Sequence, residues 1–121
     1  MSKPVGPYSP WRRAGDLVVI SGQIGLLTDD KGTHLCGDTA AEQLRQALKN
    51  ARDTLALAGA TFEQVVKATL FLVDMADFAS CNEVWLEAFT GTKPTRSAIA
   101  VAALPLGALA EVEMWAYAPE R

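Results

Sequence analysis

The chain is poor in the residues on which metal, disulfide and nucleophile-based sites are usually built. It has one histidine and two cysteines among 121 residues. The single His34 excludes a histidine-rich metal site, and it stands in a polar stretch typical of a loop or hairpin tip. Cys36 and Cys81 are far apart without a CxxC pair, which fits reduced thiols better than a disulfide framework. The sequence therefore predicts no metal, no cofactor and a cytoplasmic location.

Long apolar runs and clusters of positive charge are also missing. No apolar run approaches the roughly 18 residues of a membrane span, and residues 1–7 lack the apolar core of a signal peptide. Eleven lysines and arginines stand against 14 acidic residues, and the net charge is −3. These features predict no membrane contact and disfavour nucleic acid as a partner.

The composition is that of a globular protein, with half of the residues hydrophobic and 21% charged. The length predicts a single domain, residues 1–121. A capping box over Thr39–Glu42 and a stop at Gly59 delimit one helix, and Asp77 is a plausible N-cap for a second. Strands are expected at residues 8–12, 16–24, 65–73, 96–103 and 109–117. This order predicts an α+β fold in which two helices cover one face of a four- to six-stranded sheet.

Apolar residues fall on both faces of the expected sheet. In the last strand Val112, Met114 and Ala116 share one face, whereas Trp115 shares the other with two glutamates. Two helices cover only one face, so the other face predicts a homo-oligomer, most safely a closed ring. Trp85, on the inner face of the second helix, is interpreted as a core or interface residue.

A lone arginine, Arg96, stands at the beginning of an apolar strand, within Lys93–Ser97. Its planar guanidinium matches a carboxylate in a bidentate way. Ala98 follows on the same strand face and leaves room beside the guanidinium. Taken alone, the motif slightly favours a surface or interface ion pair over a carboxylate site.

Glu111 shares a strand face with a second glutamate and with aromatic residues. Burial raises the pKa of such a carboxyl group, which makes it a candidate general acid or base, and the alternative is an ion pair across the sheet. If the last two strands form a hairpin, Arg96 faces Trp115 and Glu111 faces Ala100, about 13 Å apart along the strand. We therefore expect no direct salt bridge, but either a ligand between the two residues or a site between subunits.

Two short motifs add candidate ligand contacts. Gly6-Pro7 fixes the direction of the chain before Tyr8, whose hydroxyl either binds a ligand or whose ring caps the sheet. Ser21 and Gly22 end a strand with a small hydroxyl and a residue that lets the backbone approach a ligand closely.

Together these elements resemble the RidA/YjgF family of reactive-intermediate deaminases over almost the whole chain. The resemblance implies a chorismate-mutase-like α+β fold, with two helices on one face of a mixed sheet of five to six strands. It also implies a homotrimer with sites between subunits. The segments that carry the resemblance are Gly6–Ser9, Val19–Ile24, Glu42-Gln43, Ala47-Leu48, Asn50, Val66–Leu72, Asp77-Phe78, Asn82-Glu83, Pro94–Ser97, Leu104-Pro105 and Glu111–Glu113.

The reaction that the resemblance implies is hydrolysis of 2-imino and 2-enamino acids, of the 2-aminoacrylate and 2-aminocrotonate type, to 2-keto acids and ammonia. Such imines leak from pyridoxal-phosphate enzymes. Arg96 corresponds to the arginine that holds the substrate carboxylate, and Glu111 to the glutamate that assists water activation or proton transfer. An imine carbon is already electrophilic, so water attacks it without a metal, a cofactor or a covalent nucleophile. The residues expected to contact the substrate are Tyr8, Ser21, Gly22, Asn82, Arg96 and Ala98.

One position departs from the family pattern. Many relatives have a cysteine where this chain has Ala98, so a thiol-dependent role is absent while main-chain contacts persist. Two other functions stay open. One is a non-catalytic trimer that binds small carboxylates or regulates. The weaker one is endoribonuclease activity, which the acidic charge and the single histidine disfavour.

Overall fold

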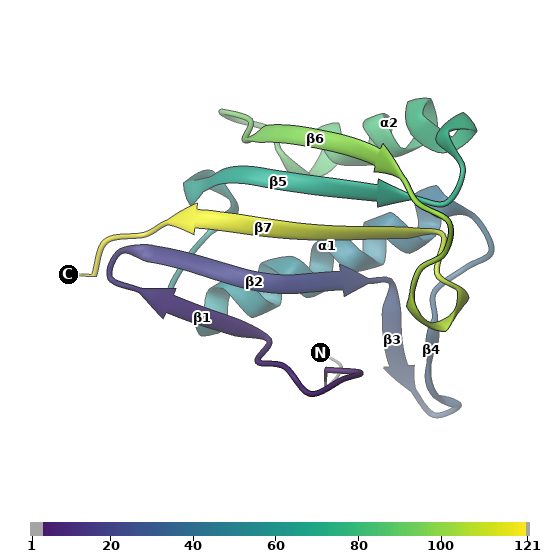
Figure 1. Cartoon of the computed structure of the whole chain (residues 1–121), viewed down its shortest axis with the longest axis horizontal. Helices are drawn as coiled ribbons and strands as arrows, with labels where there is room; N and C mark the ends of the chain where they lie inside the picture. Colours follow the sequence, from purple (N-terminus) through teal and green to yellow (C-terminus); the bar gives the residue numbers. More distant parts are fainter. Residues whose placement is uncertain (1–3, 121) are drawn as a thin grey trace.

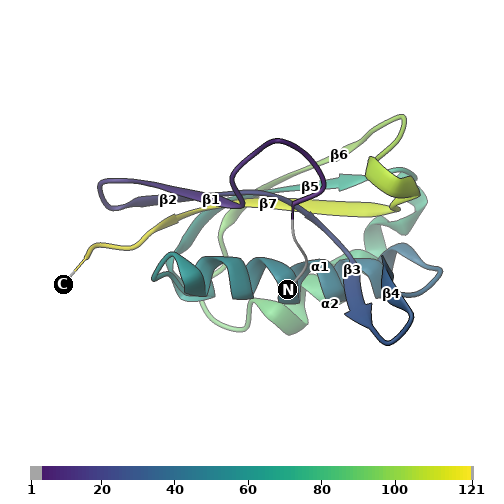
Figure 2. The ribbon, with the colours of Figure 1, turned by 90° about the horizontal axis from the view of Figure 1, so that it is seen from below.

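The computed structural model describes residues 4–120, so the start of the segment 1–7 and Arg121 lie outside the described residues. Within this range a mixed five-stranded sheet has the order β1 (Trp11–Ala14), β2 (Leu17–Ile24), β7 (Ala110–Tyr117), β5 (Val65–Leu72) and β6 (Thr95–Ala100) (Figure 1). Helices α1 (Ala40–Leu57) and α2 (Phe78–Ala88) lie on one side of it (Figure 2). The short elements are the hairpin β3 (Leu26–Asp29) and β4 (Gly32–Leu35), and the 3-10 helices η1 (Phe62–Gln64), η2 (Met75–Asp77) and η3 (Pro105–Gly107). The predicted α+β architecture is confirmed.

The core fills the space between α1, α2 and the sheet. Helix α1 begins at the predicted cap, where Oγ1 of Thr39 accepts a hydrogen bond from the Glu42 amide at 3.1 Å. It ends before Gly59, whose φ of 83° is left-handed. Burying one large aliphatic side chain contributes about 1.5–3 kcal/mol, so this layer is the main source of stability. Its fully buried members include Val18, Leu44, Leu55, Leu70, Leu72, Val112 and Met114.

Among the described residues, the opposite face of the sheet carries no α-helix, as the alternation in the last strand predicts (Figure 2). Trp115 and Tyr117 of β7 are 43% and 56% exposed there, and Ile99 of β6 is also exposed. Glu111 and Glu113 share this side of β7 and are partly buried. The second, partly apolar sheet face expected from the sequence is therefore present in the folded chain.

The pairing of the last two strands differs from the sequence expectation. Strand β6 pairs in parallel with β5, while β7 pairs antiparallel with β2 and β5. The hairpin that sets Arg96 against Trp115 and Glu111 against Ala100 is wrong. Residues 101–109 make a connection too long for a tight hairpin. Helix α2 instead supplies the crossover that parallel strands require.

The first strand starts later than predicted, whereas the second helix starts directly after Asp77, as predicted. Tyr8 lies in a turn, with its amide donating to the Gly6 carbonyl at 2.9 Å, and β1 begins only after Pro10. A proline has no amide to donate to a sheet ladder. Asp77 stands at the N-cap of α2 but its side chain makes no capping hydrogen bond. Asp74 caps the preceding 3-10 turn instead.

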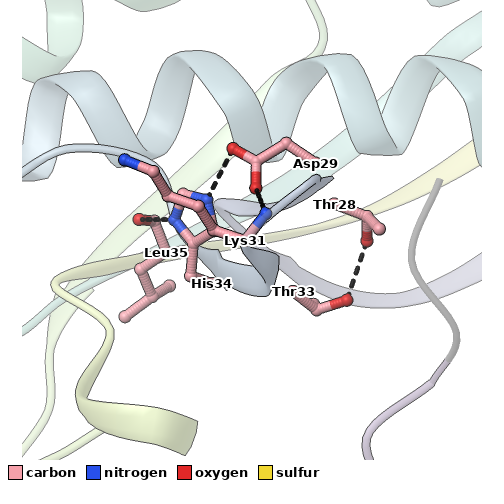
Figure 3. A network of polar contacts seen from close by, with 6 residues as sticks. All are labelled: Thr28, Asp29, Lys31, Thr33, His34 and Leu35. Carbon is pink, nitrogen blue, oxygen red and sulfur yellow. Dashed lines mark hydrogen bonds and ion pairs between the residues drawn. The ribbon is translucent and has the colours of Figure 1, made fainter.

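Residues 28–34 belong to the predicted hairpin, with Asp30 and Lys31 as the turn and the other residues in β3 and β4. His34 is exposed there, with Nε2 2.9 Å from Oδ2 of Asp29 and Nδ1 3.1 Å from the Leu35 carbonyl (Figure 3). The hydrogen bond with Asp29, helped by the Leu35 carbonyl, holds the pKa of His34 above its usual 6.5. These contacts fix the hairpin and leave His34 exposed to solvent, on strand β4 rather than in a loop.

Arg13 of β1 joins three segments that are distant in sequence. Its Nη1 donates to the Ala118 carbonyl at 2.7 Å and to the Gly15 carbonyl at 3.1 Å. Its Nη2 donates to the Ala58 carbonyl, at the end of α1, at 2.8 Å, and its Nε lies 3.2 Å from Oε1 of Glu120. The guanidinium therefore links β1, the end of α1 and the segment after β7.

Arg13→Ala is expected to lower the free energy of unfolding by about 2–3 kcal/mol, because partly buried carbonyls lose hydrogen bonds from a charged donor. Urea unfolding followed by circular dichroism measures the change. Arg12→Ala, at the exposed neighbouring position, is the matched control. Its free energy of unfolding is expected to lie within about 0.5 kcal/mol of the wild-type value. Equal unfolding midpoints for the two variants would contradict this role of Arg13.

Candidate functional site

Two buried polar side chains of α1 fix the strand ends around which the candidate site is built. Asn50 Nδ2 donates to the carbonyls of Ile24 and Leu26 at 3.1 and 2.9 Å. Gln43 Oε1 accepts from the amide of Leu109 at 2.8 Å. Buried backbone groups are costly to leave unpaired, so these bonds hold the end of β2 and the start of β7 in place.

Strand β2 contains a bulge at the predicted Ser21-Gly22 position. The register with β7 shifts within residues 20–23. Ser21 Oγ donates to the Ser9 carbonyl at 2.6 Å, which ties the N-terminal segment to the bulge. A Cβ atom on Gly22 would collide with the Glu111 carboxylate. Bulges re-aim side chains near functional sites, and here the bulge together with the absent side chain lets Glu111 lie directly against the backbone.

Glu111 lines a small pocket of about 40 Å³. The N-terminal segment, which arches over the helix-free side of the sheet, contributes Tyr8 to its wall (Figure 2). Gly22 and Pro105 complete the wall from the bulge and from η3. Tyr8 is 43% exposed, and its Oη accepts from the Val5 amide at 3.2 Å. A water needs about 10–15 Å³, so the pocket of a single chain has room for a few waters but not for a substrate.

The Glu111 carboxyl group has a perturbed protonation equilibrium. Burial raises its pKa above the ordinary value, and the neighbouring charge of Glu113 raises it further. Within residues 4–120 no side chain forms an ion pair with it. A carboxyl group that ionises closer to neutral pH is suited to exchange protons with water or with a bound ligand.

Arg96 lies on the edge strand β6 and faces helix α2. Its Nη2 donates to Oδ1 of Asn82 at 2.8 Å. Its Cζ lies 4.9 Å from the ring centroid of Trp85 and 5.5 Å from that of Phe78. Burial lowers the pKa of Arg96, but a guanidinium stays charged in proteins. Within residues 4–120 no carboxylate pairs with it, so the ion pair left open by the sequence is not formed in the described chain.

The sequence interpretation does not predict the aromatic contacts of Arg96. Trp85 is a core residue, as predicted, but its ring also packs against the guanidinium. Phe78, Asn82 and Trp85 recur at helical spacing, four and three residues apart. This spacing would have revealed a common surface, although nothing in the sequence assigns that surface to Arg96.

The predicted site residues fall into two groups within one chain. Arg96 stands opposite Ala68 of β5, whereas Glu111 stands opposite Phe71. Positions 68 and 71 point to opposite faces because side chains alternate along a strand. Tyr8, Gly22 and Glu111 therefore gather on the helix-free side, while Arg96 meets Asn82 beneath α2. Strand β5 lies between the groups.

Two small residues complete the surroundings of Arg96. Ala98 pairs with Leu70, next to the pair that contains Arg96 on the same face, as predicted. Cys81 of α2 is fully buried, and its charge state is coupled to Arg96. Burial, followed by the charge of Asp77, raises the pKa of Cys81 to about 11, so the thiol is neutral at physiological pH. It offers no thiolate beside Arg96.

Comparison with known proteins decides the family. A family model described as endoribonuclease L-PSP matches residues 1–118. The chain belongs to the RidA/YjgF family. Among the described residues, no helix is long and apolar enough to cross a membrane, and no three His, Cys, Asp or Glu side chains are grouped to hold a metal ion.

Individual RidA/YjgF relatives match nearly the whole chain. The mouse protein named 2-iminobutanoate/2-iminopropanoate deaminase is 42% identical over 109 residues, which cover 90% of this chain and 79% of the relative. A RutC family protein of Pyrococcus horikoshii is 42% identical over 115 residues, 95% and 90% of the two chains. The crystal structure of RidA from Psychrobacter sp. PAMC 21119 matches with a TM-score of 0.88 at 36% identity, covering 95% and 91%. The fold implied by the resemblance is thereby confirmed.

Gly22→Ala is expected to displace the Glu111 carboxylate, because the added methyl group would occupy its place. The free energy of unfolding should change little, because only the flexible end of the Glu111 side chain has to move. The pKa of Glu111 should move toward that of a solvated glutamate, and carboxyl NMR titration measures it. Gly91→Ala is the matched control, since a Cβ there meets nothing within 4 Å. An unchanged Glu111 titration in Gly22→Ala would refute the close approach.

Proposed function

We propose that this RidA/YjgF chain is a hydrolytic deaminase that converts reactive 2-imino and 2-enamino acids to 2-keto acids and ammonia. The observation that carries the proposal is the condition of Arg96. Its guanidinium is partly desolvated, held by Asn82, and without a carboxylate partner among residues 4–120. Such a group is prepared to hold a small carboxylate in a bidentate way. Relatives named for 2-iminobutanoate and 2-iminopropanoate support the same substrate class.

In the proposed reaction Arg96 binds the carboxylate of the imino acid, and Glu111 accepts a proton from water as the water oxygen attacks the protonated imine carbon. The carbinolamine that forms then loses its C–N bond. The proton returns from Glu111 to the departing nitrogen, and as the C–N bond breaks the carbinolamine hydroxyl gives its proton to the Glu111 carboxylate, so that ammonia leaves and the carbonyl of the 2-keto acid remains; Glu111 then passes this proton to solvent water. A 2-enamino acid first takes a proton on carbon to become the imine. The raised pKa of Glu111 suits both directions of proton transfer.

The geometry of the substrate requires a second copy of the chain. A 2-imino acid carries its carboxylate directly on the imine carbon, so the groups that bind the carboxylate and activate the water must meet within a few ångströms. In one chain Arg96 and Glu111 point to opposite sides of the sheet. We therefore propose a homotrimer in which the helix-free face of one subunit meets the Arg96 edge of the next. The exposed Trp115 and Tyr117 would be covered in such an interface.

The proposed role is removal of damaging imines that leak from pyridoxal-phosphate enzymes, in the cytoplasm. Cys36 and Cys81 are both unpaired, which fits a reducing compartment. Tyr8 and Ser21 would orient the substrate and the water from the Glu111 side, with Gly22 and Ala98 contributing main-chain contacts.

Substitution of the two central residues tests the activity. The assay generates the imine in situ with an amino-acid oxidase or dehydratase and follows release of ammonia and 2-keto acid. Arg96→Ala is expected to lower kcat/KM on the order of 100-fold, since the substrate carboxylate loses its charged partner. Arg96→Lys keeps the positive charge but loses the planar guanidinium. Its kcat/KM should therefore lie between the values of wild type and Arg96→Ala. Glu111→Gln should lower kcat roughly 100- to 1,000-fold.

Arg12→Ala controls for loss of an exposed arginine and should keep full activity. Equal rates for wild type and Arg96→Ala would reject the proposal. Arg96-dependent binding of pyruvate without turnover would favour the non-catalytic carboxylate-binding function instead.

A mixing experiment tests the site between subunits. Arg96→Ala and Glu111→Gln are each expected to be nearly inactive alone. When the two variants are co-expressed or refolded together, about a quarter of the sites in random trimers receive an intact Arg96 and an intact Glu111 from different subunits. Activity should therefore recover to about a quarter of the wild-type value. Mixtures that stay as inactive as their components would show that both residues act from the same subunit.

A further inference from the structure

Three buried rings form a column behind Arg96. The rings of Trp85 and Phe89 lie 4.9 Å apart, and the ring of Phe89 stacks on that of Phe62 at 4.6 Å with an interplanar angle of 18°. The three side chains are only 5%, 3% and 6% exposed. At the far end of the column, Cζ of Arg52 lies 4.6 Å above Phe62. The indole of Trp85 is therefore backed by packed aromatic rings and has little freedom to move.

The Arg96 guanidinium lies near both this buried ring and a more exposed one. Its Cζ is 4.9 Å from the ring centroid of Trp85 and 5.5 Å from that of Phe78. Phe78 is 38% exposed, in contrast to Trp85. The two rings stand on either side of Asn82 along α2. Of the two rings near Arg96, Trp85 is thus the one that is buried and packed against other rings.

A single hydrogen bond does not fix a guanidinium. The bond from Nη2 to Asn82 holds one nitrogen but leaves the plane free to turn about that contact. A ring within about 6 Å attracts the cation and restrains its plane. Bidentate recognition of a carboxylate depends on that plane, because two N–H groups must meet two oxygens at once.

We propose that Trp85 is a positioning residue that sets the plane of the Arg96 guanidinium, so that its unpaired N–H groups face the incoming carboxylate. The ring of Phe89 packs against the indole, and the indole holds the arginine, whereas Phe62 stacks on Phe89 one ring further away. The consequence for catalysis rests on the proposed deaminase function, whereas the orientation of Arg96 is measurable without it.

The experiment compares Trp85→Leu, Trp85→Phe and Phe62→Leu with wild type. Phe62→Leu is the matched control, because it removes a buried ring from the same column without touching Arg96. Two readouts are taken: the ring-current-shifted Nε–Hε NMR signal of Arg96, assigned through Arg96→Lys, and the steady-state constants with imine generated in situ. Thermal unfolding verifies that the two leucine variants are folded and similarly destabilised.

Trp85→Leu is expected to move the Arg96 signal toward the position of a free arginine. It should raise KM roughly 2- to 30-fold, the range of a cation–π contact, with kcat changed less than about threefold. Trp85→Phe keeps an aromatic ring at this position. Its Arg96 NMR signal and its KM should therefore both lie close to those of wild type. Phe62→Leu should leave the Arg96 signal and KM near wild type. A Trp85→Leu variant with an unchanged Arg96 signal, or a Phe62→Leu variant with the same changes, would overturn the proposal.

Failure of the deaminase function gives a different result. If wild type shows no turnover, the proposed function fails, and the Arg96 signal together with calorimetric affinity for pyruvate still decides the role of Trp85. An Arg96 NMR signal that moves in Trp85→Leu but not in Phe62→Leu then supports the positioning role of Trp85. An Arg96 signal that moves in both variants, or in neither, contradicts that role.

Discussion

The parallel pairing of β6 with β5 is the constraint on which the site depends. It places β5 between Arg96 and Glu111 and turns the two side chains to opposite sides of the sheet. Parallel strands need a long crossover, and here the crossover is α2. The same connection therefore brings Asn82 and Trp85 over Arg96. The β5–α2–β6 connection therefore sets both the strand order at this edge of the sheet and the residues that surround Arg96.

The two halves of the proposed site are built by different means. Arg96 is held by aromatic rings and one amide oxygen. Glu111 instead lies against Gly22, the residue without a side chain in the bulge of β2. The buried Asn50 donates a hydrogen bond to the carbonyl of Ile24 at the end of β2. Both arrangements set a partly buried charged side chain against a packed surface, the ring of Trp85 for Arg96 and the strand backbone at Gly22 for Glu111. Because a 2-imino acid presents its carboxylate and its imine carbon as neighbours, two rigid half-sites in one chain are useful only when a second subunit brings them together.

Much of the fold follows from local sequence signals, but the strand partners do not. The cap at Thr39 and the alternation in β7 predict α1 and the buried side of the last strand. Whether β6 pairs with β5 or with β7 depends on contacts remote in sequence, and the apolar pattern of β6 suits either partner. The order strand, helix, strand from β5 to β6 was the available signal for parallel pairing. The bulge at Ser21 arises only from pairing with β7, so the sequence of β2 alone does not reveal it.

The candidate site shows the same division between residue type and arrangement. Arg96, Asn82 and Glu111 were named from their chemistry and from the family pattern, yet a buried tryptophan that fills the core looks identical in sequence to one that supports a cation. Trp85 is a buried core side chain whose ring also contacts the Arg96 guanidinium. Hydrolysis of an imine needs no covalent nucleophile, and the neutral thiol of Cys81 supplies none. Rate enhancement must then come from orientation and proton transfer. A protein that works this way depends on the packing that fixes its few polar groups, so residues such as Trp85 and Gly22, which react with nothing, carry as much of the proposed function as Arg96 and Glu111.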